Sequence, residues 1–449
     1  MQKKQIYSLI IASMVTCLFI STTYAENNMQ NINQAFSQKK YLTYLPHTLQ
    51  NYISHIAKTH HTMNFIKIQD DLAHESIIEA KKGWRPQISA QGYIGRSRTD
   101  VNTTDERIIT TAKFHQLTMS QPIYSGDRIG SRIRLAKMQE NEANAQTKND
   151  IDQFLFQGTE AYISFFKNSS LVTLYNETVE NAKNRLTSIK AERDAGERTS
   201  TDIALATSHL ATAEADLAHA KANLEAAHVS FTYYTGSHTP FKIDKKIDYL
   251  ALETNFVPPH ITYLYQYNPR IQKANAEINS AKENIKRAKA EYSASVTIDA
   301  TATFNDRVDE IGRRLDSEDF SLLARYNLPL YERGIEYSQE KTARLQEKRA
   351  KNRLIALSGD ISSEYQSNVL AYNASKTIVK SYKTALETAE KAAFAASKEY
   401  EYGFRSITEL YDAEQNVTEA KSKLIDAKAN KLTNILRLLK DLGELNQGY

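Results

Sequence analysis

The chain repeats itself at an offset of 207 residues, and this duplication limits its possible folds more than any other feature. The halves share single residues and the same order of helix-like and strand-like segments. The pairs of identical residues are Pro122 and Pro329, Tyr124 and Tyr331, Tyr175 and Tyr382, Ala182 and Ala389, Gly196 and Gly403, Arg198 and Arg405, and Thr201 and Thr408. Such a duplication predicts two copies of one structural unit. We expect repeats at residues 26–235 and 270–449, separated by the proline-rich segment 236–269.

Residues 1–25 have the pattern of a secretory signal peptide. Lys3 and Lys4 precede an apolar run at 6–20, and we expect cleavage after Ala25. The only cysteine, Cys17, lies in the apolar run, so the processed chain would have no thiol. This excludes disulfides, thiolate catalysis and cysteine-based metal sites. The small residues of a lipidation site are missing around this cysteine, so we expect export without a lipid anchor.

The composition favours long helices and argues against nucleic acid as a partner. Only 14 glycines and 8 prolines interrupt 449 residues rich in Ala, Lys, Glu and Leu, which is typical of extended helices. The formal net charge of +4 falls to about +2 without the signal peptide, which is too small for a nucleic-acid-binding protein. We find no pattern of a phosphate-binding loop, a catalytic site or a metal site, and we expect no enzymatic activity, cofactor or metal ion.

Each repeat contains two segments in which apolar and polar residues alternate, the period of a β-strand. In the first repeat they lie at 84–94 and 108–124, on either side of a charged loop at 96–107, and form a hairpin at about 86–124. In the second repeat a hairpin is expected at about 295–331. Four strands cannot close a barrel in an outer membrane, which needs about eight. A membrane form of this chain therefore requires several copies, and three copies would supply twelve strands.

Long helical segments follow each predicted hairpin. The first is a helix at 127–194, a turn at Gly196 and a second helix at 200–234. In the second helix Ala206, Ala213, Ala220 and Ala227 recur every seven residues, which predicts close coiled-coil packing. The second repeat has helices at 333–402 and 405–445 around Gly403. Shorter helices are expected before the strands, at 47–82 and 270–291.

The turn at Gly403 leads directly into an acidic helix start. Ser406 and Glu409 have the spacing of a capping box, in which the serine and glutamate side chains bind the free backbone groups of the first turn. Asp412 follows three residues after Glu409, so both carboxylates lie on one face of the helix.

Taken together, these motifs resemble the TolC family of outer-membrane export channels. The resemblance rests on Trp84-Arg85-Pro86-Gln87-Ile88-Ser89 entering a strand, Gln121-Pro122-Ile123-Tyr124 closing the hairpin, Asn268-Pro269-Arg270 opening the second half, and the turns at Gly196 and Gly403. It implies a mainly α-helical fold with transmembrane β-structure: a trimeric twelve-stranded outer-membrane barrel, continued by a long coiled-coil tunnel in the periplasm. It also implies a Gram-negative cell and contact with outer-membrane lipid.

The resemblance implies roles for residues at the two turns. Glu409 and Asp412 match acidic positions that ring the closed periplasmic end of the pore, and Tyr400 and Arg405 would reach towards Thr201 and Asp202 to hold that end closed. Two alternatives stay open. Glu409 and Asp412 are also ordinary acids of a helix start, and the other four side chains could simply be solvated at exposed turns.

The expected function is a passive duct for type I secretion, multidrug efflux or both. The resemblance implies that an inner-membrane transporter, of the ABC or the proton-driven kind, recruits the duct through a periplasmic adaptor (membrane fusion) protein. The alternative is a soluble periplasmic coiled-coil adaptor or scaffold without a channel. The two predicted strand pairs favour the duct, because a soluble coiled coil has no use for them.

Overall fold

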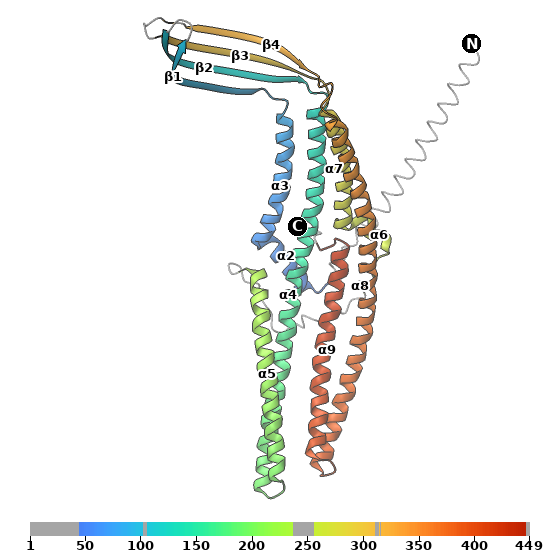
Figure 1. The fold of residues 1–449 in the computed structure, drawn as a ribbon. Helices are drawn as coiled ribbons and strands as arrows, with labels where there is room; N and C mark the ends of the chain where they lie inside the picture. The colour runs from blue at the N-terminus through green and yellow to red at the C-terminus, as the bar shows by residue number, and fades with distance from the viewer. Residues whose placement is uncertain (1–44, 102–105, 237–255, 310–313, 315, 446–449) are drawn as a thin grey trace, which may run out of the picture. The chain divides into compact units, whose positions relative to one another are not determined.

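The computed structural model describes residues 45–101, 106–236, 256–309, 314 and 316–445 (Figure 1). The predicted signal peptide lies outside these residues. The described residues form two compact units, each of which takes segments from both sequence repeats. The hairpin unit comprises Met1–Thr59, Phe154–Pro258 and Asn368–Tyr449, and the sheet unit comprises His60–Gln153 and Pro259–Ser367.

The hairpin unit contains two pairs of antiparallel helices. Helix α5 (Ser200–Thr235) runs back along the second part of α4 (Arg128–Asp194), and α9 (Ile407–Asp441) runs back along the second part of α8 (Ile335–Glu401) (Figure 1). The short helix α2 (His47–Thr59) belongs to the same unit. Helices α4 and α8 begin and end at positions 207 residues apart, so the duplication seen in the sequence extends to the helix boundaries.

Glycine is needed at both hairpin turns because of the backbone conformation. Gly196 has a φ of 82° and Gly403 a φ of 77°, values that side-chain-bearing residues rarely adopt. At the first turn the amide of Glu197 donates to the carbonyl of Glu192 over 2.9 Å, and at the second the amide of Phe404 donates to that of Glu399 over 2.8 Å. These hydrogen bonds satisfy carbonyl groups that have no partner within the helix. Each long helix therefore ends two residues before its glycine.

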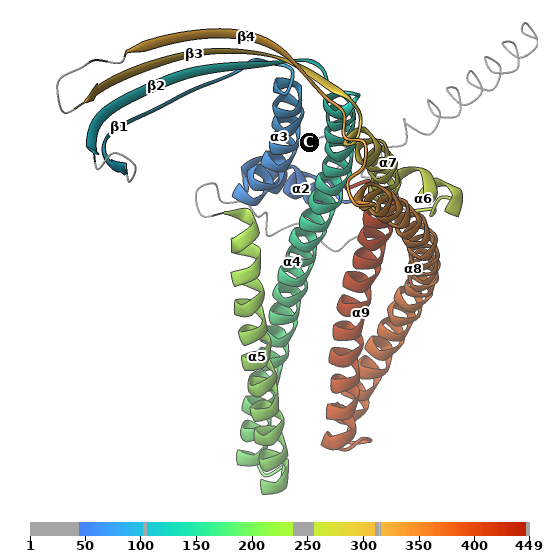
Figure 2. The same cartoon turned by 45° about the horizontal axis from the view of Figure 1, so that its top comes forward.

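The sheet unit contains all four strands. They are β1 (Gln87–Val101), β2 (Glu106–Tyr124), β3 (Ser295–Asp309) and β4 (Ser317–Asn327). They lie side by side in chain order, and each is antiparallel to its neighbour, in a curved sheet (Figure 2). The helices of this unit are α3 (His61–Lys82), α6 (Ile261–Tyr267), α7 (Pro269–Ala290) and the first parts of α4 and α8.

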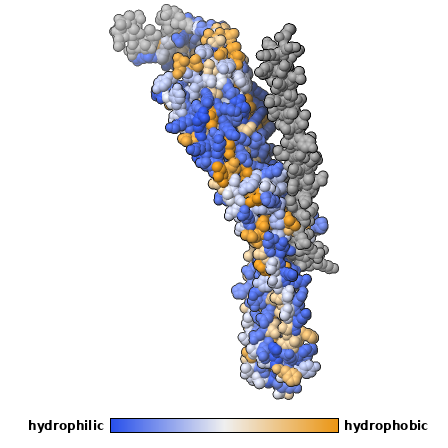
Figure 3. All heavy atoms as spheres, turned by 90° about the vertical axis from the view of Figure 1, so that its right-hand side faces the viewer, coloured by the Kyte–Doolittle hydropathy of each residue, from blue (hydrophilic) through white to orange (hydrophobic). Residues whose placement is uncertain are grey.

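The strand register separates apolar from polar side chains. One row across the four strands consists of Ile88, Met119, Ala300 and Leu322, and the next row on the same face consists of Ala90, Leu117, Ala302 and Phe320. Between them, on the other face, lie Ser89, Thr118, Thr301 and Ser321. In these rows the predicted alternation becomes an apolar and a polar face, while Tyr93, Phe114 and Leu323 lie elsewhere on the polar side. Apolar side chains also gather at the sheet end of the molecular face drawn in Figure 3.

The two strand-to-helix junctions share an unusual backbone. Gly126 and Asp127 before α4 have φ values of 56° and 68°, and Arg333 and Gly334 before α8 have 59° and 76°. The glycine occupies the first position of the pair at one junction and the second position at the other. Each position of the pair thus holds a side-chain-bearing residue at one of the two junctions, at a backbone cost of about 1 kcal/mol, and the surroundings decide where glycine is required.

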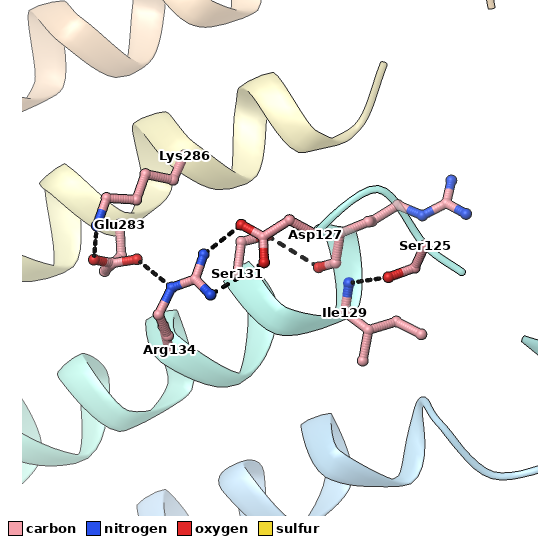
Figure 4. Close-up of polar contacts among 8 residues, drawn as sticks. Ser125, Asp127, Ile129, Ser131, Arg134, Glu283 and Lys286 are labelled. Atoms are coloured by element: carbon pink, nitrogen blue, oxygen red, sulfur yellow. Dashed lines mark hydrogen bonds and ion pairs between the residues drawn. The ribbon is translucent and has the colours of Figure 1, made fainter. Parts of the chain in front are cut away.

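An ion-pair network joins the start of α4 to α7 (Figure 4). The guanidinium of Arg134 donates to both carboxylate oxygens of Asp127, over 2.5 and 3.1 Å, and to Glu283 over 3.0 Å. Lys286 donates to the other oxygen of Glu283 over 2.6 Å. The hydrogen bond from Arg134 holds the pKa of Asp127 below its usual value. The network thus fixes the left-handed residue Asp127 against a second helix.

Three boundaries differ from the sequence predictions. The charged segment 96–107, predicted as a loop, is mostly strand, because β1 continues to Val101 and pairs there with Glu106. The helix predicted at 47–82 is two helices, separated at His60, whose side chain accepts from the amide of Thr62. The predicted connecting segment contains the helix α6. Among the helices in the described ranges, none is long and apolar enough to cross a membrane.

Gly126→Ala should destabilise the protein much more than Gly334→Ala. A Cβ at position 126 would lie 2.2 Å from the Cβ of Ser293 and 2.7 Å from the carbonyl oxygen of Ala294, whereas nothing lies within 4 Å of one at position 334. Both variants carry the backbone penalty of about 1 kcal/mol, and only the first adds an overlap, for a total of about 3 kcal/mol. Denaturant unfolding in detergent measures the difference; equal losses would contradict the steric account.

Candidate functional site

The two hairpin turns have the same set of polar contacts. The Nε of Arg198 donates to Glu192 over 2.6 Å at the first turn, and the Nε of Arg405 donates to Glu399 over 2.7 Å at the second. Each following helix starts with a capping box, formed by Thr199 and Asp202 in α5 and by Ser406 and Glu409 in α9. The predicted capping box at Ser406 is therefore present, and the first turn has its counterpart.

The two hairpins meet in a small apolar core next to the turns. Its buried residues are Ile189, Ala206, Ala396, Tyr400, Ile407, Leu410 and Tyr411, which come from all four helices. Tyr400 is only 3% exposed, and its ring lies under the guanidinium of Arg198, at 4.3 Å from ring centroid to Cζ. Burial raises the pKa of Tyr400. This cation–π contact joins the end of the second hairpin to the turn of the first.

Of the predicted contacts between the turns, only that of Tyr400 with the first hairpin is present among the described residues. Tyr400 reaches the first hairpin, but it meets Arg198, which the sequence reasoning did not single out. Arg405 pairs within its own hairpin. In the described part of this chain, no hydrogen bond or ion pair joins Tyr400 or Arg405 to Thr201 or Asp202. Thr201 is exposed, and the carboxylate of Asp202 accepts from the amide and hydroxyl groups of Thr199.

Glu409 and Asp412 line one groove between α8 and α9. The groove has a volume of about 910 Å³, and its α8 wall consists largely of small side chains, Ala385, Ala389, Ala392 and Ala395. The carboxylate of Glu409 accepts hydrogen bonds from the amide and hydroxyl of Ser406, over 2.9 and 2.8 Å. The hydrogen bond from the backbone amide is the main cause that lowers the pKa of Glu409. Asp412 is exposed and takes no part in the cap.

The sequence duplication distinguishes the roles of Glu409 and Asp412. Glu409 has an acidic counterpart 207 residues earlier in Asp202, which also caps a helix, so capping alone explains its type. Asp412 corresponds to Leu205 and has no structural counterpart in the first repeat. Its carboxylate is therefore the one that the local structure does not require.

An ion pair between the hairpins was also not predicted from the sequence. Arg185 of α4 donates to Glu414 of α9 over 2.9 Å. Both residues lie on long, charged helices on which most charges face solvent. Only knowledge of which helix faces meet could have selected this pair, since nothing in the local sequence marks either residue.

The sequence pattern of the family described as outer membrane efflux protein matches residues 53–237 and 262–444. These two segments make up most of the chain and fall on the two repeats. The chain belongs to this family. It is an outer-membrane efflux channel of the TolC family, a transport protein and not an enzyme. Membership decides against the alternative of a soluble periplasmic adaptor.

Relatives of this efflux channel match over most of their length. The outer membrane efflux protein BepC of Brucella suis is 22% identical over 386 residues, covering 85% of this chain and 81% of the relative. Outer membrane protein TolC of Escherichia coli strain K12 is 24% identical over 402 residues, covering 84% and 78%. Solved structures share the fold: CusC matches with a TM-score of 0.75 at 14% identity, covering 88% of this chain and 92% of that chain. The outer-membrane channel OprN matches with a TM-score of 0.75 at 16% identity, covering 90% and 91%.

The duplicated arginines of this channel offer a matched test of the hairpin contact. Arg198→Gln removes the cation–π contact to Tyr400, worth about 1 kcal/mol, while Arg405→Gln removes a contact within one hairpin. Amide hydrogen exchange at the end of α8 should accelerate about fivefold in the first variant, following that energy, and change little in the second. Equal acceleration in both variants would show that Arg198 does not join the hairpins.

Proposed function

We propose that three copies of this chain form a passive export duct in which each copy supplies four strands of a twelve-stranded barrel. The observation that carries the proposal is the apolar face of the sheet. Ile88 and Ile94 of β1 are 65% and 72% exposed, and Phe320 and Leu322 of β4 are 71% and 73% exposed. An exposed apolar surface of this extent is unfavourable in water and is the expected surface of a sheet in contact with lipid.

The polar face of the sheet supports the same arrangement. Ser120 donates to Asp299 over 2.6 Å, and Arg325 donates to the same carboxylate over 2.9 Å, so side chains of β2, β3 and β4 form a hydrogen-bonded row. Polar side chains on this face suit a water-filled interior. The outermost strands β1 and β4 each have one partner strand within the chain, and neighbouring copies would pair with their open edges.

The duct would work with two further proteins. Because it has no energy source of its own, an inner-membrane transporter of the ABC or proton-driven kind would drive export, and a periplasmic adaptor would connect it to the duct. The second hairpin turn offers a contact for the adaptor, since Tyr402 and Phe404 are 75% and 85% exposed there. Type I secretion and multidrug efflux both fit this arrangement.

Glu409 and Asp412 would form the gate of the duct. In a trimer, their groove faces would bring six carboxylates around one axis, a ring that attracts cations and resists full ionisation. Tyr400 and Arg405 would hold the closed state. Within one chain Tyr400 meets the first hairpin through Arg198, and Arg405 is exposed. We therefore assign the contact of Arg405 with Thr201 and Asp202 to neighbouring copies.

The gate can be tested without disturbing the helix cap. Glu409→Gln together with Asp412→Asn removes both charges, and glutamine is also accepted in a capping box. Block of the channel by a trivalent cation such as hexaamminecobalt, measured in planar bilayers, should weaken about tenfold or more because the charged ring is gone. Asp412→Asn alone should produce much of this change, since Asp412 has no role in the cap.

Ser406→Ala is the matched control, because it weakens the cap by about 1 kcal/mol and keeps both carboxylates. Its cation block should equal that of the unaltered channel. An unchanged block in the doubly neutralised channel would remove the gate assignment and leave Glu409 with its capping role alone.

A further inference from the structure

A histidine joins the two hairpins at a point that the duplication does not explain. The imidazole of His209, in α5, stacks on the ring of Tyr411, in α9, with centroids 4.4 Å apart and planes inclined by 11°. The residues 207 positions away are Asn416 and Ala204, so the stack has no second copy in the chain. It lies next to the apolar core that contains Tyr411, Ala206 and Tyr400.

In the part of the chain that the structure describes, the Nδ1 atom of His209 has no hydrogen-bond acceptor beside it. Tyr411 is 8% exposed, and within the described residues neither its hydroxyl nor the Nδ1 of His209 has a hydrogen-bond partner, although both atoms are buried. A neutral imidazole needs only one donor and can leave Nδ1 as an unprotonated nitrogen. An imidazolium would carry an N–H group at Nδ1, buried without an acceptor, which is unfavourable.

Charged groups on the neighbouring helices do not reverse this preference. Glu414 of α9 attracts a protonated His209, but it is already paired with Arg185 of α4. Glu177 of α4 and Lys421 of α9 line the same cavity with opposite charges, and α8 contributes the apolar Ala393. The attraction of an imidazolium for the ring of Tyr411 would offset part of the cost. Burial nevertheless lowers the pKa of His209, and Glu414 only opposes it.

Solvent can reach the histidine. A cavity of about 440 Å³, lined mainly by α4 and α9, has His209 in its wall. Polar side chains including Asn181, Asn184 and Gln415 line it. Protons from the surrounding medium can therefore exchange with the imidazole while the two hairpins remain packed.

We propose that the His209–Tyr411 stack is an acid-sensitive contact, which holds α5 against α9 while the imidazole is neutral and releases it when the imidazole is protonated. A histidine whose pKa is lower in the packed state stabilises packing above its ordinary pKa of about 6.5. That stabilisation is lost as the pH falls below this value. Acid would thus loosen one contact between the hairpins. Opening of the duct as a consequence rests on the proposed gate, whereas the loosening of the contact does not.

The contact can be followed by the reactivity of a cysteine placed beneath it. Ala206→Cys puts a small thiol in the buried core beside Tyr411, and Ala211→Cys puts one on the exposed side of the same helix. Both are made with Cys17→Ser in the full-length protein and purified in detergent. The ratio of their reaction rates with a maleimide cancels the direct effect of pH on the thiol. Between pH 7.5 and 5.5 this ratio should rise about threefold or more, because protonation of His209 loosens the contact at position 206 and leaves position 211 unchanged.

His209→Phe keeps an aromatic ring on Tyr411 but cannot be protonated, so the ratio should no longer depend on pH. His219→Phe, at an exposed position ten residues later in α5, is the matched control and should leave the pH dependence intact. If position 206 proves intolerant, Ala413→Cys, which packs against the same core from α9, replaces it. The whole series is repeated with Glu409→Gln and Asp412→Asn, which separates this contact from the gate.

A constant ratio in the unaltered channel would overturn the proposal, and so would a rise that persists in His209→Phe. Loss of cation block without loss of the pH response would leave the stack as proposed. Conversely, failure of the gate variants to change cation block, with the pH response intact, would reject the gate alone.

Discussion

The structure depends on how the open edges and the apolar face of a four-stranded sheet are covered. Within one chain, β1 and β4 each have a single partner, and large apolar side chains of both strands are exposed. Water cannot stabilise this surface, and lipid cannot satisfy free strand edges. Lipid on the apolar face and further copies of the chain at the edges together meet both requirements. In the proposed trimer, membrane insertion and self-association would therefore be parts of one event.

A different interaction controls the turns of the hairpin unit. Tyr400 is buried where the hairpins meet, and its ring makes a cation–π contact with the guanidinium of Arg198 at the other turn. The helix caps next to it fix where α5 and α9 begin, and one cap uses the carboxylate of Glu409. Asp412 is left with no structural duty. The duplication provided two nearly equal turns, and the differences between them, such as Asp412 against Leu205, are where function is expected.

Much of this fold could be predicted from the sequence because its signals are local. Gly196 and Gly403 identify the turns because glycine readily adopts the positive φ that they require. The alternation of apolar residues likewise indicates which side chains share a face, such as Ile88 and Met119. The extension of β1 through Arg96 could not be predicted, because pairing with β2, rather than side-chain type, decides it. The contacts of Arg198 and Arg185 were likewise hidden, since they depend on which faces of two long helices meet.

The central claim is that the sheet of one chain is incomplete and that three chains complete it. The mass of the detergent-solubilised protein, measured by native mass spectrometry after removal of the detergent micelle, tests this most directly. The account predicts a single species of three processed chains that persists on dilution, because strand pairing closes every edge. A stable species of one chain, with the sheet still protected from amide hydrogen exchange, would contradict it.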